Sequence, residues 1–361
     1  MLLVLSREFD VSTGEAAAVV SWFAIAYGSM QLLYGPLGDR YGKLRVVVLA
    51  AFACSVFSLL TSLAPNFGLL AFARAGMGAT AAGIVPMAMA WIGDQVPYGK
   101  RQEAIARLTS ATVSGLMMGQ WFGGVAADSL GWRIAFFVLA GLFFVAAWRL
   151  HRSVGTQQAP QSAQAAVGGA AYALMSLQLL RLSRVRWVLA MTLVEGALAF
   201  GSIAFAPSLL TQNFGLSASS AGAMMILYGI GGLCYSQLAG RWISRLGEQG
   251  LALGGGALIA LGLLLLTWAS QVWLGALACM VAGLGFYMLH SNLQVQATQM
   301  APEARATAVT LFACTLFFGQ SIGVVLLGLS LDQGLSAHAF SASALAMLVL
   351  GWQVSRKLRR H

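Results

Sequence analysis

The sequence YGPLGDRYGKLR at residues 34–45 joins two apolar stretches, 16–37 and 44–64. Each stretch is about as long as the roughly 20 residues that a helix needs to cross the hydrocarbon core of a bilayer. Between them lie glycines, which permit tight turning and close backbone approach, and side chains of fixed charge. The glycines are Gly35, Gly38 and Gly42, and the charged residues are Asp39, Arg40, Lys43 and Arg45. The pattern predicts two membrane-spanning helices joined by a charged turn at one membrane face.

The composition extends this prediction to the whole chain. Of the 361 residues, 59% are hydrophobic and only 9% are charged, whereas soluble proteins average about 25% charged residues because their surface faces water. At about 20 residues a span plus short turns, a chain of this length holds roughly ten to twelve helices and leaves little room for a separate soluble domain. We therefore expect an all-α polytopic membrane protein surrounded by a lipid bilayer.

Apolar stretches bounded by charges and turn residues predict eleven spans: 16–37, 44–64, 67–91, 105–127, 132–150, 186–209, 219–241, 249–269, 272–294, 306–329 and 339–355. The net charge of +10 does not indicate nucleic-acid binding, because 18 of the 21 Lys and Arg residues cluster in alternate loops. Such an excess marks the cytoplasmic side of a membrane protein. We expect a multi-pass protein of the cell membrane, inner or plasma, with its carboxyl terminus in the cytoplasm.

One connection is much longer than the others. Residues 151–183 include GTQQAPQSAQAAVGGAA, a stretch rich in Gln, Ala, Ser and Gly that buries too little apolar area to fold. We predict a cytoplasmic linker at 151–183, between an amino-terminal bundle at 1–150 and a carboxyl-terminal bundle at 184–361. The last part of the linker, 172–184, mixes Leu with Arg and is predicted to form a short amphipathic helix on the membrane surface.

The two halves of the chain repeat each other at an offset of 204 to 205 residues, as the duplicated halves of transporters do. Aligned pairs include Ser12 and Ser217, Gly35 and Gly240, and Asp128 and Asp332. In this alignment the helix at 186–209 has no counterpart, because only MLLVLS precedes residue 7. We expect eleven helices to be present and the first of a usual twelve to be missing. A functional protein of eleven helices is the alternative.

The charged turn carries a family resemblance. Residues 34–45 resemble the signature loop of the major facilitator superfamily (MFS), and a degenerate copy, GRWISRLG, stands at 240–247 in the second half. In that copy Ser244 replaces the acidic residue. The resemblance implies two pseudo-symmetric helix bundles with a substrate cavity between them, and a monomer that moves small molecules by alternating access.

Two further motifs are similar to those of the same superfamily. FARAGMGATAAG at 72–83 resembles its fourth-helix motif, with Arg74 as the basic residue. GLMMGQWFGG at 115–124 resembles the fifth-helix motif of its antiporters, except that Gln120 replaces the usual proline. The chain is thus most similar to the branch that exports drugs and metabolites in exchange for protons.

Proton coupling requires a titratable side chain inside the membrane. Glu195 is the one acidic residue well inside a predicted span, about nine residues, or roughly 13 Å, from Arg186. Because ionising a carboxyl there is costly, we expect Glu195 to alternate between protonated and charged forms as the cavity opens to either side. The alternative is a permanently protonated carboxyl that ties helices together. His290 is the second candidate, because histidine titrates near neutral pH.

The charged turn also suggests a gate. Asp39 is expected to pair with Arg40 or Arg101, and with the start of the helix near residue 306, when the cytoplasmic side is closed. Asp94 is expected to join this network. The remaining members of the candidate gating loop are Gly35, Gly38, Gly42 and Lys43. The alternative role of these charges is orientation in the membrane alone.

Arg74 lies about a third of the way through its predicted span, where a cation needs a carboxylate, a helix end or water. A structural ion pair or snorkelling to the membrane surface is one interpretation. Contact with an anionic substrate, or a part in proton coupling, is the other.

Small residues recur at helical spacing in both halves. Gly115, Gly119 and Gly123 are four residues apart, and Gly319 and Gly323 repeat the spacing in the second half. Such stripes let helices pack closely in membranes. We predict helix packing at these glycines, and the family resemblance implies a tight contact between the bundles.

Together these features predict an exporter of drug-like compounds or metabolites that works by proton antiport. Gln120 keeps open the import of a small metabolite with protons, and a non-transporting membrane receptor or scaffold is the alternative of a different class. The sequence shows no paired carboxylates, nucleophile constellation or clustered metal ligands, so we expect no enzyme activity, cofactor or metal. The cysteines lie far apart in apolar stretches and are predicted to be free thiols: Cys54, Cys234, Cys279 and Cys314.

Overall fold

The computed structural model describes residues 1–154 and 169–358. All regular structure in these residues is helical, and no strand occurs among them. The helices are, in chain order, α1 Leu2–Phe9, α2 Thr13–Tyr41, α3 Lys43–Ser62, α4 Phe67–Ala81, α5 Ile84–Gln95, α6 Tyr98–Val125, η1 Ala126–Leu130, α7 Trp132–Val154, α8 Gly169–Leu179, α9 Ser183–Glu195, η2 Gly196–Phe200, α10 Gly201–Phe214, α11 Ala218–Trp268, α12 Val272–Gln299, η3 Pro302–Ala304, α13 Arg305–Asp332 and α14 Ser336–Leu358. Here η1 and η2 are π-helices and η3 is a 3₁₀ helix.

Nine helical stretches in the described part of the chain are long and apolar enough to cross a membrane. The longest, Ala218–Trp268, contains two spans, because Gly247 at φ 62° and ψ 176° breaks the helix near its middle. Helix α6 is as long as a span, at 28 residues or about 42 Å, but is more polar. Counting Ala218–Trp268 twice and adding α6 gives eleven helical stretches of span length in the described residues, which is consistent with the eleven predicted spans.

The helix ends follow local sequence signals. Ser12 caps α2: its hydroxyl accepts from the Glu15 N–H at 3.0 Å, and the Glu15 carboxylate accepts from the Ser12 N–H at 2.9 Å. Gly42 separates α2 from α3 with φ 90°, a conformation that glycine adopts without steric cost. The charged turn predicted from residues 34–45 therefore contains one non-helical residue.

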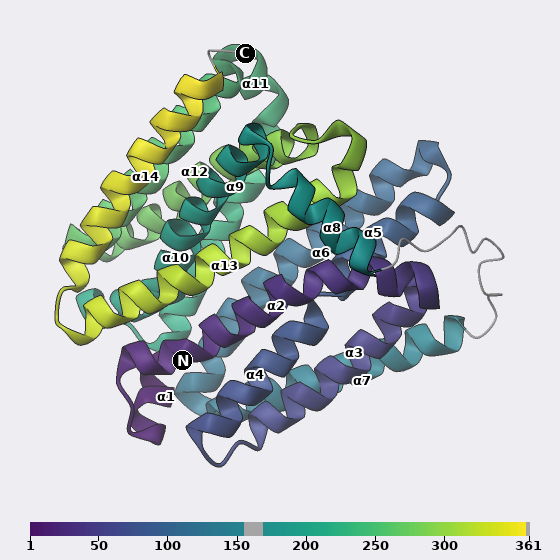
Figure 1. Cartoon of the computed structure of the whole chain (residues 1–361). Coiled ribbons are helices and arrows are strands. Elements are labelled where there is room, and N and C mark those ends of the chain that lie inside the picture. The colour runs from purple at the N-terminus through teal and green to yellow at the C-terminus, as the bar shows by residue number, and fades with distance from the viewer. Residues whose placement is uncertain (155–168, 359–361) are drawn as a thin grey trace.

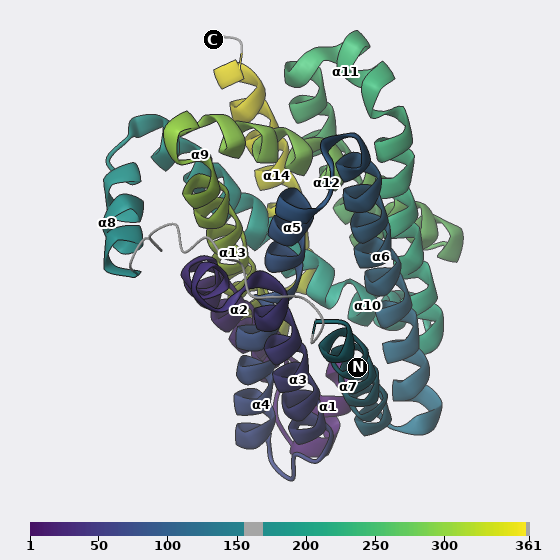
Figure 2. The same cartoon turned by 90° about the vertical axis from the view of Figure 1, so that its right-hand side faces the viewer.

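The helices form two bundles, one from each half of the chain (Figure 1). In the first bundle α2 packs on α4, and α3 packs on α7; in the second, α11 packs on α12 and α14. The bundles meet along two seams, α2 against α13 and α6 against α11, and the second seam is seen in Figure 2. This arrangement confirms the predicted all-α fold of two pseudo-symmetric bundles.

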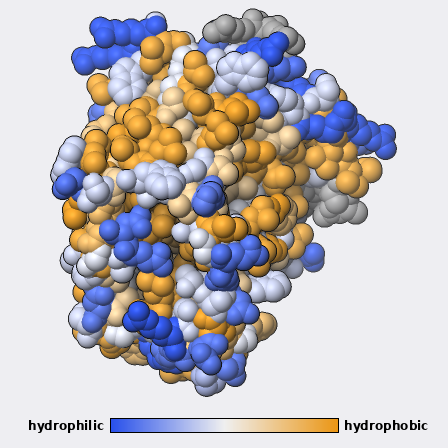
Figure 3. All heavy atoms as spheres, turned by 90° about the vertical axis from the view of Figure 1, so that its left-hand side faces the viewer, coloured by the Kyte–Doolittle hydropathy of each residue, from blue (hydrophilic) through white to orange (hydrophobic). Residues whose placement is uncertain are grey.

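Successive spans run in opposite directions, so their turns gather at two ends of the molecule. One end, which we call the basic end, carries the charged turn at Gly42, the break at Gly247 and the end of α14. The opposite end carries the starts of α2, α4 and α11. Between the ends the surface is apolar: Figure 3 shows hydrophobic side chains over much of one face, and Leu49 and Leu142 are 66% and 63% exposed. Such a surface suits contact with lipid.

The predicted linker at 151–183 falls partly on residues 155–168, which lie outside the described residues. Before them α7 continues to Val154. After them the chain forms α8, where the sequence predicted a short surface helix over 172–184.

Helix α1 is fastened to α7 at the opposite end. The Glu8 carboxylate accepts hydrogen bonds from Trp132 and Arg133, and Arg133 also donates to the Ala64 carbonyl at 3.0 Å. Burial by itself raises the pKa of Glu8, but the bonds from Arg133 and Trp132 hold that pKa below its ordinary value. Glu8 is therefore ionised at neutral pH and ties α1 to the helices beside it.

The prediction that Gly115, Gly119 and Gly123 form a packing stripe is wrong. Gly115 and Gly119 are exposed, with no neighbouring atom within 4 Å of the position that a Cβ would take, and Gly123 has a single side chain near it. The close contact of α6 lies at Gly124, which faces the backbone of Ala218. The spacing identified the correct helix but the wrong face, because four-residue periodicity alone does not say which side meets a neighbour.

Gly319 and Gly323 do lie in close contact, but inside the second bundle. A Cβ at Gly319 would lie 3.0 Å from the Ala197 nitrogen, and one at Gly323 would lie 2.7 Å from the Ala197 Cα. Gly319 therefore packs α13 against the end of α9 and the start of η2, and Gly323 packs α13 against η2. The contact between bundles that the resemblance implied is made by other residues.

We expect Gly323→Ala to lower the free energy of unfolding by about 1–3 kcal/mol, because the backbones of α13 and η2 have to separate to admit a methyl group. Gly115→Ala faces open space and is expected to be neutral, or stabilising by up to about 1 kcal/mol, because alanine favours a helix. Thermal unfolding of the detergent-solubilised protein measures both variants. Equal losses from the two would contradict this account of the packing.

Candidate functional site

Glu195 is the last residue of α9, and its side chain is completely buried, with 0% exposed. One carboxylate oxygen, Oε2, lies 3.1 Å from Nδ1 of His290 on α12. The other, Oε1, has no hydrogen-bond partner among the described residues. The two residues that the sequence singled out separately as coupling candidates are therefore in direct contact.

Aromatic rings enclose the imidazole of this pair. The His290 ring lies 5.0 Å from that of Phe286, nearly parallel to it at 16°, and 5.5 Å from that of Phe312. The His290 side chain is 18% exposed, whereas Glu195 is not exposed at all. The rings hold the imidazole in place and shield the carboxyl. The geometry therefore allows a proton to reach Glu195 through His290.

The pair has chemically distinct states. With one shared proton, the bond joins either a carboxylate and an imidazolium or a carboxylic acid and a neutral imidazole; removing that proton leaves a carboxylate with no charged partner. In an apolar interior an unpaired charge is far more costly than a paired or neutral group. Loss of the shared proton therefore favours a structure in which water or a cation reaches Glu195.

Tyr228 adds a further polar group to the same region. Its side chain is 7% exposed, and its ring lies 6.0 Å from that of Phe286. Its hydroxyl, like Oε1 of Glu195, is buried without a hydrogen-bond partner in the described part of the chain. Buried polar groups without partners are rare in proteins and mark places that water or a bound molecule can fill. The sequence alone does not single out this hydroxyl, because a single tyrosine in a span is usually a packing residue.

The type of helix changes directly after Glu195. The α-helix gives way to the π-helix η2, which begins at Gly196, and π segments are frequent at functional sites. A Cβ at Gly196 would lie 3.2 Å from the Gln320 nitrogen, and one at Gly201 would lie 2.8 Å from the Gly323 carbonyl carbon. The segment after Glu195 is thus held against α13 at both ends, which fixes the direction of the carboxyl.

Arg74 on α4 is held by rings and a thioether. Its Cζ lies 4.7 Å from the centre of the Phe23 ring and 5.5 Å from that of Phe136, and Nη1 lies 3.2 Å from Sδ of Met77. No carboxylate of a described residue pairs with it. The ion-pair interpretation therefore finds no support here, and cation–π contacts take its place.

The charged turn forms only part of the predicted gating network. Lys43 pairs with Asp94, which joins α3 to α5. Asp39 is exposed and makes no hydrogen bond or ion pair with Arg40, Arg101 or any other described residue. Arg40 lies over a tyrosine ring, and Arg101 donates to a backbone carbonyl at 2.8 Å. The predicted pairing of Asp39 is absent from this structure, in which the basic end is not locked by that residue.

The glycines of the turn differ in their surroundings. Gly38 is buried, and a Cβ there would strike the side chain of Met87 on α5. Gly35 and Gly42 have no atom within 4 Å of such a position, and only Gly42 has a positive φ. A glycine is thus needed at position 38 because the Met87 side chain lies so close, and at position 42 because the backbone has a positive φ.

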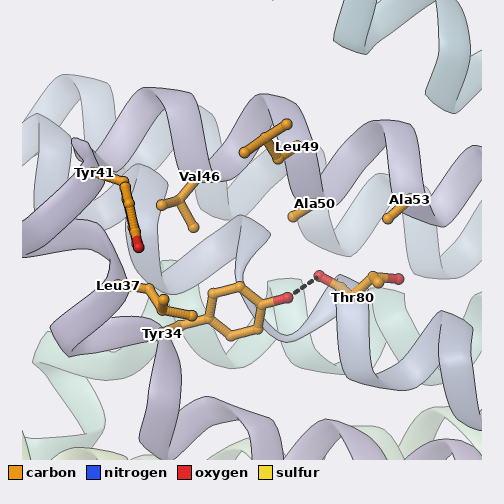
Figure 4. Close-up of a pocket in the computed structure, with 8 residues that line it drawn as sticks. All are labelled: Tyr34, Leu37, Tyr41, Val46, Leu49, Ala50, Ala53 and Thr80. Atoms are coloured by element: carbon orange, nitrogen blue, oxygen red, sulfur yellow. Dashed lines mark hydrogen bonds between the residues drawn. The ribbon is translucent and has the colours of Figure 1, made fainter. Parts of the chain in front are cut away.

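An apolar cavity of about 350 Å³ opens beside the turn (Figure 4). Its lining residues are Tyr34, Leu37, Tyr41, Val46, Leu49, Ala50, Ala53 and Thr80. The Tyr34 hydroxyl points along its floor and donates to the Ala79 and Thr80 carbonyls at 3.1 and 3.3 Å. None of the lining side chains is a charged or coupling candidate, so the cavity adds no chemistry to the Glu195 site.

Polar side chains at the basic end of α12 form a network of hydrogen bonds with neighbouring helices. Gln296 donates to the Glu248 carboxylate at 3.3 Å and accepts from Arg184 at 3.2 Å, while Asn292 donates to the Glu248 carbonyl at 2.6 Å. These bonds tie α12 to the break in α11. No group of three metal-binding side chains occurs among the described residues.

Comparison with known proteins agrees with this architecture. The sequence model of the Major Facilitator Superfamily matches residues 1–324. An uncharacterised MFS-type transporter, YceJ of Bacillus subtilis, is 26% identical over 91% of this chain and 83% of its own length. A probable sugar efflux transporter of Helicobacter pylori is 23% identical over 98% of this chain and 88% of its own length.

Solved structures have the same fold. The nucleoside transporter NupG superposes with a TM-score of 0.78 at 14% identity, covering 99% of this chain and 93% of its own. A bacterial homologue of the human lysosomal transporter Spinster, inward-facing and unoccupied, superposes with a TM-score of 0.76 at 17% identity, covering 98% and 92%.

The contact between Glu195 and His290 predicts a large coupling in a double-mutant cycle. We expect Glu195→Gln and His290→Gln to be non-additive in the free energy of unfolding by about 1.5–3 kcal/mol, the range for hydrogen bonds to charged groups. Glu195→Gln combined with Glu303→Gln, an exposed acid in η3, serves as the uncoupled control. Additive effects in the first pair would show that the contact carries no energy.

Proposed function

The chain belongs to the Major Facilitator Superfamily, and from this premise we propose that it is a secondary active transporter driven by protons. In our proposal it exports a small molecule, a drug-like compound or a metabolite, by alternating access. The two bundles rock about a central substrate site, so that the site opens to one side of the membrane at a time. The observation that carries the proton role is the 3.1 Å contact between a fully buried Glu195 and His290.

The proposed cycle follows from the cost of charge in the apolar interior. A proton arriving from outside passes through the imidazole and neutralises the carboxyl, which favours the closed, dry interior. Opening to the cytoplasm admits water and lets the carboxyl release the proton to that side. Substrate then binds in the deprotonated state and leaves to the outside as the next proton enters. One proton thus moves inward for each outward passage of substrate.

Export is supported by relatives named probable sugar efflux transporters, one of which, from Helicobacter pylori, is 23% identical to this chain. The sequence feature that favours the opposite direction is Gln120, which replaces a proline of the antiporter motif. Import coupled to protons is therefore the second candidate. The sign of the pH change that substrate causes in everted vesicles separates the two.

The placement in the membrane is part of the proposal. The basic end is taken as cytoplasmic, in the inner or plasma membrane, because basic loops are retained on that side. The protein works as a monomer of two bundles, at 1–150 and 184–361, joined by the linker at 151–183.

The charged turn is proposed to act at the basic end. Lys43 and Asp94 already pair there, while Asp39 is exposed and unpaired with any described residue. When the basic end closes, Asp39 meets Arg101 or the first turn of α13, whose free N–H groups attract a carboxylate. The pairing then breaks each time that end opens.

Glu195→Gln is expected to abolish uphill transport and to spare exchange down a gradient, because glutamine occupies the site without carrying a proton. The test uses proteoliposomes and a compound chosen by screening a panel of sugars, nucleosides and drug-like molecules. Glu303→Gln, which removes an exposed charge, should behave as wild type. Uphill accumulation by Glu195→Gln would overturn the proton role, and a lack of proton flux with every solute would favour a receptor or scaffold.

Asp39→Asn is expected to slow transport about fivefold without lowering thermal stability, because the lost contact of about 1 kcal/mol forms only in the closed basic end. Asp10→Asn, at the opposite end, is the control for removal of an exposed carboxylate. A wild-type rate in Asp39→Asn would leave orientation as the only role of this charge.

A further inference from the structure

Two aspartates at the end opposite the basic loops bridge the two bundles. Asp128 lies in η1, directly after α6 of the first bundle. Its carboxylate accepts from the backbone N–H groups of Ala218 at 3.0 Å and Ser219 at 2.6 Å. These are the first residues of α11, which belongs to the second bundle. The carboxylate thus caps a helix across the seam between α6 and α11.

The second aspartate makes the mirror-image contact at the other seam. Asp332 ends α13 of the second bundle and accepts from the Ser12 hydroxyl at 2.6 Å and the Gly14 N–H at 2.9 Å. Ser12 and Gly14 lie at the start of α2 in the first bundle. The internal repeat pairs Asp128 with Asp332, at an offset of 204 residues. The same kind of contact therefore occurs at both seams. At one seam an aspartate of the first bundle caps a helix of the second, and at the other an aspartate of the second bundle caps a helix of the first.

Both bridges join a negative charge to the positive end of a helix. The first N–H groups of a helix have no partner within it, and the aligned peptide dipoles add to their attraction for an anion. Ser12 and Ser217 already cap these helices with their hydroxyls. The aspartates satisfy further N–H groups, from a different bundle.

A glycine lies one helical turn before each aspartate and lets the seam close. A Cβ at Gly124 would lie 2.8 Å from the carbonyl carbon of Ala218, and one at Gly328 would lie 2.9 Å from the Cα of Gly14. Any larger residue would hold the helices apart and take the carboxylate out of hydrogen-bond range. The pattern of glycine followed four residues later by aspartate occurs at both seams.

The charge on Asp128 is fixed at neutral pH. Burial by itself raises its pKa, but hydrogen bonds from Ser219, Ala218 and Ser217 lower that pKa below its ordinary value. Asp128 therefore stays ionised and does not carry protons, which separates its role from that of Glu195.

We propose that Asp128 and Asp332 form a two-point latch that holds the end opposite the basic loops closed, and that both bridges break whenever that end opens. The latch rests on the alternating access of the proposed function, because only a rocking motion of the bundles pulls a carboxylate of one away from a helix start of the other. The structure combines a closed latch with an unpaired Asp39 at the basic end. It therefore represents the state in which the end opposite the basic loops is shut.

The test measures distance, which depends neither on a substrate nor on proton coupling. Spin labels on cysteines introduced at Pro65 of the first bundle and Gln271 of the second, both exposed, report the separation of the bundles at this end. The four native cysteines are first replaced by alanine. We expect one short distance in this background. Asp128→Asn or Asp332→Asn should raise the ratio of open to closed molecules about fivefold, and the double variant about twenty-five-fold, since a helix cap contributes about 1 kcal/mol.

Asp10→Asn is the matched control, because it removes from the same end an exposed carboxylate that makes no hydrogen bond or ion pair with any described residue. The latch is overturned if the double variant keeps the distances of the parent protein, or if Asp10→Asn shifts them equally. Should the double variant not fold, hydrogen exchange at the Gly14 and Ser219 amides of the single variants decides, with faster exchange expected and unchanged exchange contradicting the latch. Altered distances with no proton flux would uphold the latch and reject the proposed coupling.

Discussion

A carboxyl group placed in an apolar interior constrains everything around it. Glu195 is wholly buried, and one of its oxygens has a single protein partner, His290. Its charge is therefore tolerable only while a proton, an imidazolium or water compensates it. The packing of η2 on α13 fixes the carboxyl in place, and the rings about His290 shield it. Only groups in direct contact with the pair can therefore compensate its charge. In the proposed cycle, a change in the proton count at this pair changes which arrangement of the helices is most stable.

The remaining features are arranged about this constraint with the symmetry of a duplicated chain. Each bundle sends one aspartate to cap a helix of the other at one end of the seams, while the opposite end carries the charged turn and its unpaired Asp39. In the proposed cycle, Asp39 meets Arg101 or the first turn of α13 when the basic end closes, and the two aspartate bridges hold the other end when that end is closed. In that cycle, protonation of Glu195 acts on both ends through the helices that connect them.

Much of the fold was predictable from the sequence, because lipid imposes strong rules on composition and length. The eleven spans, the two bundles and the presence of a charged turn within residues 34–45 follow from hydropathy, the internal repeat and one motif. The glycine stripe at Gly115 and Gly119 was predicted wrongly, since spacing does not reveal which face of a helix meets a neighbour. Glu195 and His290 are 95 residues apart in the sequence, so their contact depends on the tertiary structure and could not be predicted from a local sequence pattern. The internal repeat of the sequence aligns Asp128 with Asp332, but only the structure shows that both aspartates cap helices.

Infrared difference spectroscopy of Glu195 tests the central claim most directly, because it observes the carboxyl itself. Spectra of the lipid-reconstituted protein are recorded at a series of increasing pH values, and those of Glu195→Gln are subtracted. The account predicts a protonated-carboxyl band, absent from the variant, that gives way to a carboxylate band. A band that persists unchanged at every pH would mean a permanently protonated acid, and would contradict a transporter driven through this residue.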